Sequence, residues 1–349
     1  MEWIDCLRGL VMLMVVFGHC EIYLPDWNVS DVGLFTGRYH VLIFFFISGF
    51  LFCTDKFTFS APGILTADLR KKLRTILWPT LVMLSLFYFM FFRHQPLEVL
   101  ANDNYKSGYW FTIVLMELYV LSMPLICLLN WRRLPQVASV TAVVAVMLIA
   151  GLSPEILPGE FWDSKTVHFF SLELVLRMWP FFLLGVLGRV LYNGHREKLA
   201  GREALICSIV ILIAGSLWHY GNPEGLLALV QQSVVVAGIF MVCLGAGELL
   251  SSRYAVSRFL ARVGRATLVV YLFHYFVLLT SHRIVSHFLT RPWISDRITI
   301  VPVTLLVTLF VIVCCMLADK LLRRTKLHAL IFPPSGQRLM RKLSGETST

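Results

Sequence analysis

The sequence predicts an all-α fold: a polytopic membrane helical bundle of about ten transmembrane helices with both termini cytoplasmic. Hydrophobic residues make up 57% of the 349 residues and charged residues only 15%, and the mean hydropathy is +0.73. Long apolar stretches recur along the whole chain, which is typical of membrane-spanning helices. Lysine and arginine are rich in alternate loops, as expected where positive charge stays on the cytoplasmic side.

Ten apolar stretches are candidate spans, although several are shorter than the roughly 20 residues that cross a bilayer at right angles. They cover 7–25, 39–54, 75–93, 109–129, 135–151, 171–191, 204–219, 226–248, 266–289 and 299–322. We therefore expect a transmembrane domain over 1–325 and a basic cytoplasmic tail over 326–349. Only one basic residue precedes the first stretch and no clear cleavage site follows it, so we expect it to be retained rather than removed as a signal peptide.

Most of the 31 lysines and arginines fall in segments that are cytoplasmic if the N-terminus lies inside. The charge map therefore supports ten spans. It also explains most of the net charge of +10, so we expect membrane lipids, and not nucleic acid, as a partner.

The cysteines predict neither a metal site nor a disulfide framework. None forms a CxxC pair or a Cys/His set with zinc spacing, and most lie in apolar runs, so they are expected to be small buried side chains. The set is Cys6, Cys20, Cys53, Cys127, Cys207, Cys243, Cys314 and Cys315.

Arg8 and His19 stand out in the first stretch because they are eleven residues apart. That spacing is almost three helical turns, so both side chains share one face, about 16 Å apart along the axis. Ionisable groups inside a membrane helix are functional candidates. The alternative is that Arg8 anchors the helix at the interface and His19 is a satisfied core or interfacial histidine. Asp5 is too far from His19 to pair with it, so we expect it to pair with Arg8 or a neighbouring helix.

Two further segments could contribute to a site. In FFFISGFLF, Ser48 and Gly49 favour close helix packing, and the serine hydroxyl can bond across the interface or to its own helix. Before the third stretch, RKKLRTILWPTL contains Arg70, Lys71 and Arg74. This basic cluster is either an interfacial anchor or a phosphate-binding patch for a polyanionic cofactor.

These segments, taken together and in order, resemble the acyltransferase-3 family of integral membrane acyltransferases. The segments are IDCLRGLVMLMVVFGHC, FFFISGFLF, RKKLRTILWPTL, GYWFTIVLMELYVLSMPL, WPFFLLGVLG and VGRATLVVYLFH. The resemblance covers nearly the whole chain, and the set is more specific than any motif alone. Arg8 and His19 match the family's characteristic basic residue followed, after ten others, by histidine.

The resemblance implies an O-acyltransferase in a bacterial inner (plasma) membrane. The donor would be an acyl-CoA, typically acetyl-CoA, and the acceptor a hydroxyl of an extracytoplasmic or lipid-linked carbohydrate. His19 and Arg8 would be catalytic, with Arg8 also holding the donor. Donor contacts would include Lys71, Arg74 and Arg70; Ser48 matches the second-span motif and is a further candidate. His19 could act as general base or carry the acyl group covalently.

Other polar residues within the spans are also candidates. Glu117 could orient His19, bind a sugar, or make a structural contact between helices. Glu173 and Arg177 are four apart and are expected to pair, or they line an outer acceptor cleft. For His274 we favour structural packing, although the family often carries histidine there. Trp110, Trp162, Trp179 and Trp293 suit the interfacial aromatic belt, and their faces could also stack on a sugar ring.

A secondary transporter or flippase for a polar or lipid-linked solute is the main alternative, since it too uses many spans and buried charges. Transporters often have two related halves with broken helices, and no such symmetry is seen here. A noncatalytic membrane scaffold would leave the Arg8 and His19 alignment unexplained. The sequence identifies neither the acceptor nor the oligomeric state.

Overall fold

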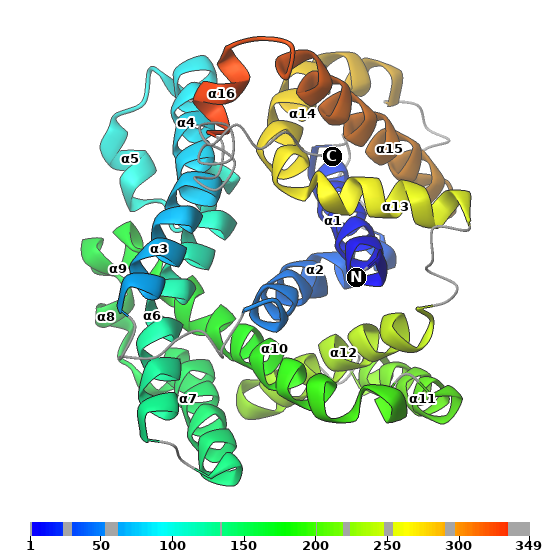
Figure 1. Ribbon diagram of the computed structural model, residues 1–349. Helices are drawn as coiled ribbons and strands as arrows, with labels where there is room; N and C mark the ends of the chain where they lie inside the picture. The colour runs from blue at the N-terminus through cyan, green and yellow to red at the C-terminus, as the bar shows by residue number, and fades with distance from the viewer. Residues whose placement is uncertain are drawn as a thin grey trace, which may run out of the picture. The chain divides into compact units, whose positions relative to one another are not determined.

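The structure, a computed structural model, describes residues 2–23, 30–52, 62–132, 135–199, 201–218, 224–247, 254–289 and 297–333. These residues are almost entirely helical, and no strand occurs among them (Figure 1). Eight of the described helices are long and apolar enough to cross a membrane. A ninth span is formed if α13 and α14, which meet at an 83° bend, count as one. The predicted multi-pass, all-helical architecture is confirmed.

The helices divide into two compact units. The first unit comprises Met1–Phe52 and Pro180–Leu317 and the second comprises Cys53–Trp179 and Ala318–Thr349. The first contains α1 (Glu2–Tyr23), α2 (Asp31–Phe50), most of α10 (Leu172–Leu199), α11 (Arg202–Trp218), α12 (Gly225–Gly245), α13 (Ala255–Arg265), α14 (Thr267–Leu289) and most of α15 (Arg297–Leu322). The second contains α3 (Pro62–Lys72), η2 (Leu73–Leu77), α4 (Trp78–Phe87), η3 (Tyr88–Phe92), α5 (Leu97–Asn102), η4 (Lys106–Gly108), α6 (Trp110–Arg132), α7 (Gln136–Ile156), α8 (Gly159–Trp162), α9 (Lys165–Phe169) and α16 (Leu327–Ile331).

Each predicted span falls on a helix, but some predicted boundaries were wrong. The helix α2 begins eight residues before the predicted start at 39, because Ser30 caps it: the Ser30 hydroxyl accepts a hydrogen bond from Gly33 N–H at 3.0 Å. The third predicted span is the end of a 28-residue run, Leu65–Phe92, that includes two π-helical turns. The seventh corresponds to α11, which has 17 residues and is not among the nine spans above.

Glycines bring α1 and α13 into backbone contact in the first unit. A Cβ on Gly9 of α1 would overlap the carbonyl oxygen of Leu260, and a Cβ on Gly264 of α13 would overlap that of Asp5. The bent pair α13–α14 therefore packs against α1 with both of its arms, as Figure 1 shows for the yellow helices. Small residues permit this approach, which depends on van der Waals packing because lipid provides no hydrophobic force between helices.

Glycines likewise bring α2 and α10 into backbone contact. A Cβ on Gly49 would overlap the carbonyl oxygen of Phe182, and one on Gly185 would overlap that of Phe46. The predicted close packing at Gly49 is confirmed. These two close contacts, between α1 and α13 and between α2 and α10, form the frame of the first unit.

The second unit contains a compact loop structure between α5 and α9. The Lys106 ammonium donates to the carbonyl oxygens of Ala101, Asp103 and His168 at 2.7, 2.8 and 2.8 Å. Burial lowers the pKa of Lys106, while the nearby carboxylates of Asp103 and Glu117 raise it. Three carbonyl acceptors satisfy all three ammonium protons, so Lys106 holds these loops together.

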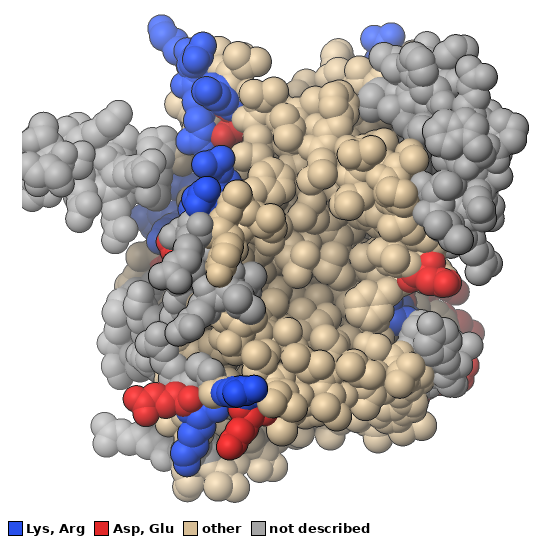
Figure 2. All heavy atoms as spheres, turned by 90° about the vertical axis from the view of Figure 1, so that its right-hand side faces the viewer, with Lys and Arg blue, Asp and Glu red and all other residues tan. Residues whose placement is uncertain are grey.

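The described surface is suited to lipid. Figure 2 shows a broad uncharged surface whose Lys and Arg side chains lie mostly along its left edge, with a few near the other borders. Large apolar side chains such as Phe89, Ile149 and Leu306 are each more than half exposed. An exposed apolar surface on this scale is explained by contact with hydrocarbon chains. The protein is a multi-pass membrane protein.

Candidate active site

His19 lies near the C-terminal end of α1 and forms hydrogen bonds through both ring nitrogens. Its Nδ1 is 3.1 Å from Nε2 of His274, and its Nε2 is 3.0 Å from the Tyr275 hydroxyl. Both partners belong to α14, and all three side chains lie in the first unit. His40 of α2 is close enough to interact electrostatically with His19. His19 is therefore held in a defined orientation by groups outside its own helix.

His274 is fully buried, with none of its surface exposed. Its Nδ1 lies 2.6 Å from the Tyr271 carbonyl oxygen and 3.2 Å from that of Val270. The rings of His19 and His274 are stacked, with centroids 5.0 Å apart and planes 25° from parallel. His274 is packed as predicted, and its bond to His19 is a second feature that the sequence did not indicate.

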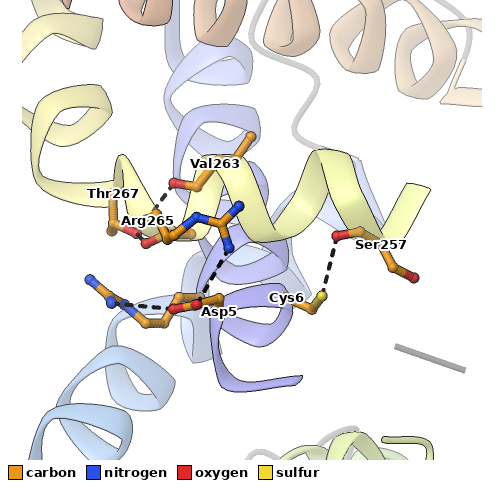
Figure 3. A network of polar contacts seen from close by, with 8 residues as sticks. Asp5, Cys6, Ser257, Val263, Arg265 and Thr267 are labelled. Carbon is orange, nitrogen blue, oxygen red and sulfur yellow. Dashed lines mark hydrogen bonds and ion pairs between the residues drawn. The ribbon is translucent and has the colours of Figure 1, made fainter. Parts of the chain in front are cut away.

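At the other end of α1, two arginines share one carboxylate (Figure 3). Arg8 Nη1 lies 3.9 Å from Asp5 Oδ1, and Arg265 Nη1 of α13 lies 3.6 Å from Asp5 Oδ2. The predicted pairing of Asp5 with Arg8 and a neighbouring helix is confirmed. The side chains of Asp5, Arg8 and Arg265 are 26%, 32% and 57% exposed. Both arginine side chains of this cluster are therefore partly accessible to solvent.

Ser48 does not bond across a helix interface. Its hydroxyl donates to the carbonyl oxygen of Phe44, one turn back in α2, at 2.8 Å. This is the second of the two arrangements predicted for it. Its side chain is half-buried, and its hydroxyl lone pairs can still accept a hydrogen bond, so Ser48 stays a candidate for contact with the acyl donor.

The basic cluster of Arg70, Lys71 and Arg74 lies in the second unit, on the helical run formed by α3 and η2. All three side chains are exposed. Lys72 differs, because its ammonium lies 3.5 Å from Asp68 and 3.9 Å from the centre of the Tyr119 ring. The exposed trio has the solvent access that phosphate binding requires, whereas Lys72 has a structural role.

The predicted acceptor contacts also lie in the second unit. Glu117 is half-buried in α6, and its Oε2 is a buried atom without a hydrogen-bond partner. Arg177 Nε is 3.5 Å from Glu173 Oε1, which confirms the predicted pair. Trp110, at the start of α6, packs edge-to-face on Tyr105 with ring centres 6.0 Å apart. The roles of Glu117, Trp110 and Arg177 in substrate binding stay predictions.

Of the other predicted features, the tryptophans and cysteines are described only in part. Trp179 Nε1 donates to Ser122 Oγ at 3.0 Å. The seven cysteines in the described ranges are free; Cys6, Cys20, Cys127 and Cys315 are buried, but Cys207 is exposed, contrary to expectation. Cys53, Trp293 and residues 334–349 of the predicted tail lie outside the described residues.

Sequence reasoning missed three contacts of α1: those of His19 with His274 and with Tyr275, and that of Asp5 with Arg265. Each partner lies more than 250 residues from the α1 residue that it contacts. One signal was present, because a histidine in the middle of an apolar span is itself a functional candidate. Periodicity within α14 could not show that this position faces α1.

Comparison with known protein families identifies the class to which this fold and site belong. The family model described as an acyltransferase domain, that of the acyltransferase-3 family, matches residues 1–319. The chain belongs to the acyltransferase-3 family. It is accordingly a membrane acyltransferase. Searches of curated proteins and of solved structures gave no match.

Proposed function

We propose that the protein transfers an acyl group, acetyl being favoured, from cytoplasmic acyl-CoA to a hydroxyl of an extracytoplasmic or lipid-linked carbohydrate. The observation that carries the proposal is the arrangement of His19. This partly exposed imidazole, within a membrane helix, is hydrogen-bonded through Nδ1 to a buried histidine and through Nε2 to a tyrosine hydroxyl. An oriented imidazole can act as general base or as nucleophile in acyl transfer to a hydroxyl.

Two routes are compatible with this geometry. As a general base, His19 removes the proton from the acceptor hydroxyl while its oxygen attacks the thioester carbonyl; the C–S bond then breaks, and the CoA thiolate takes up the proton. As a nucleophile, His19 forms an N–acyl bond while the C–S bond breaks and CoA leaves as thiolate; the acceptor oxygen then displaces the imidazole, and the proton of its hydroxyl passes to the thiolate. A positioned base contributes about 10²–10⁴ in rate.

The donor is proposed to bind at the inner end of α1. Coenzyme A is a polyanion, and the guanidinium groups of Arg8 and Arg265 lie together beside Asp5, where arginine side chains can bind phosphate. Arg8 and His19 are separated by about 16 Å along α1, comparable with the reach of an extended pantetheine arm. Arg70, Lys71 and Arg74 of the second unit are proposed as further phosphate contacts, with Ser48 as a donor contact.

The acceptor is proposed to approach from the outer side of a bacterial inner membrane. His19 is near the end of α1 opposite Arg8, and the positive-inside distribution of charge assigns Arg8 to the cytoplasmic end. Glu117, Trp110 and Arg177 are the proposed acceptor contacts, because carboxylates, guanidinium groups and indole faces suit sugar hydroxyls and rings. Nothing in the described residues groups three or more metal-binding side chains, and no step of the proposed reaction uses a metal.

Transfer from labelled acetyl-CoA tests the proposal. The full chain in lipid nanodiscs is expected to release CoA from acetyl-CoA, and cells carrying the gene are expected to show acylated surface glycans by mass spectrometry. His19→Ala should abolish both signals, whereas His195→Leu, at an exposed position of α10, should retain them. Full activity of folded His19→Ala would overturn the assignment of His19.

A further inference from the structure

We propose that His274 is a positioning residue that keeps His19 in the tautomer with a proton on Nδ1 and a bare Nε2. The inference rests on the proposed function, since it defines which atom of His19 reacts. It follows from a chain of hydrogen bonds that begins at the backbone of α14 and ends at His19 Nε2.

The first step fixes the proton on His274. Its Nδ1 faces the carbonyl oxygens of Tyr271 and Val270, at 2.6 and 3.2 Å. Carbonyl oxygens can only accept hydrogen bonds, so Nδ1 of His274 must be the N–H donor. Both carbonyls belong to the helix that carries His274, so this constraint is built into α14.

The second step transfers the constraint to His19. A fully buried imidazolium is costly unless an anion pairs with it, and the contacts described for His274 are two carbonyls and three rings, those of His19, Tyr271 and Tyr275. A neutral His274 with a proton on Nδ1 has a bare Nε2, which can only accept. Because this atom lies 3.1 Å from His19 Nδ1, His19 Nδ1 must carry a proton and donate.

The third step identifies the reactive nitrogen. With its proton on Nδ1, neutral His19 has a lone pair on Nε2, and the Tyr275 hydroxyl donates to it at 3.0 Å. Both proposed routes need this lone pair, either to accept the acceptor's proton or to attack the thioester. Because Nε2 has one lone pair, an acceptor hydroxyl reaches it only by taking the place of the Tyr275 hydroxyl.

The hydrogen bond between His19 and His274 also stabilises the His19 imidazolium that forms during general-base catalysis. When Nε2 takes a proton, Nδ1–H continues to donate to His274, and the bond becomes charge-assisted and stronger. His274 thereby performs for His19 the orienting role that a carboxylate performs in hydrolytic triads.

Two variants separate orientation from packing. His274→Leu keeps a similar volume but removes the acceptor, and we expect kcat to fall by about 10²-fold with little change in the KM for acyl-CoA. In His274→Gln the amide oxygen can accept from His19 Nδ1, and we expect most of the lost kcat to return. A packing role alone would favour leucine over glutamine in this buried position.

Nitrogen NMR of the full chain in lipid, with ¹⁵N-labelled histidine, reads the tautomer directly. The His19 signals are assigned by difference from His19→Gln. We expect a protonated Nδ1 and a bare Nε2 in the wild type, and a changed tautomer population in His274→Leu. A wild-type His19 protonated on Nε2 would overturn the inference even if the leucine variant fails to fold.

The outcomes distinguish this inference from the proposed function. If His19→Ala is inactive but His274→Leu keeps wild-type kcat, the positioning role is wrong and the proposed function stands. If the wild-type chain transfers no acyl group, the proposed function falls. If folded His19→Ala is fully active, the assignment of His19 falls and the inference falls with it. Loss of kcat in His274→Leu with recovery in His274→Gln supports both.

Discussion

The two ends of α1 bind their surroundings in different ways. At the outer end, His19 has hydrogen bonds of 3.1 and 3.0 Å to two side chains of α14, one of them fully buried. At the inner end, Arg8 and Arg265 contact Asp5 at 3.9 and 3.6 Å, and Arg265 is more than half exposed. The contacts of His19 are thus hydrogen bonds of ordinary length that involve a fully buried side chain, whereas those of Arg8 and Arg265 are longer ion pairs that include a mostly exposed arginine.

Under the proposed function, this difference corresponds to two chemical tasks. Bond-making requires groups held close to their reacting geometry by packed neighbours. Capture of a charged ligand requires long-range attraction and accessible side chains, and loose ion pairs in solvent cost little to rearrange. The following experiments test that division, beginning with the largest expected effect.

Substitutions at the two ends should affect different kinetic constants. His19→Gln is expected to reduce kcat by about 10²–10⁴-fold, because it removes the group that transfers the proton. Arg8→Gln should instead act mainly through KM, as loss of a binding contact does. Steady-state kinetics with varied acetyl-CoA measures both. If Arg8→Gln lowers kcat and leaves KM unchanged, the proposed division between a donor-binding end and a reacting end of α1 is wrong.

The frame that supports both ends should be sensitive to one added methyl group. Gly9→Ala forces a Cβ against the Leu260 carbonyl, and overpacking of this kind typically costs about 1–3 kcal/mol. Gly37→Ala in α2 is the matched control, since nothing lies within 4 Å of its Cβ position. Thermal unfolding in detergent should show a lower midpoint for Gly9→Ala alone. Equal midpoints would mean that α13 can shift on α1.

Ionic strength should weaken the inner end and leave the outer end unchanged. At 0.15 M salt, charges are screened over about 8 Å, and at 1 M over about 3 Å. We therefore expect the KM for acyl-CoA to rise several-fold with added salt, while kcat stays constant. Arg8→Gln and Arg265→Gln should each reduce this salt dependence. A salt-independent KM would argue against docking of phosphate at these arginines.

Removal of the Tyr275 hydroxyl is expected to have the smallest effect. In Tyr275→Phe the ring packing remains, and His19 keeps its bond to His274, so kcat should change by only a few-fold. The neutral hydrogen bond removed is worth about 0.5–1.5 kcal/mol. The same kinetic assay with His274→Leu alongside provides the comparison. A larger loss in Tyr275→Phe would give the hydroxyl a direct part in the reaction.

The sequence predicted those features that are encoded locally. Apolar length located the helices, and helical spacing placed Arg8 and His19 on one face of α1 and paired Glu173 with Arg177. The start of α2 was missed because a single capping serine, rather than hydropathy, determines it. The contacts of His274 and Arg265 could not be predicted, because they depend on which helices become neighbours, and the glycines that decide this show no periodic pattern.

The separation of His19 and His274 by 255 residues has a consequence for biogenesis. The first helix enters the membrane early in synthesis, yet its histidine lacks its partner until α14 has been translated and inserted. Domains tend to assemble from the N-terminus during synthesis. A chain truncated before α14 would therefore contain both Arg8 and His19, but the His19 ring would lack the contact that orients it. The contact between the two histidines is thus formed only after most of the polypeptide has left the ribosome.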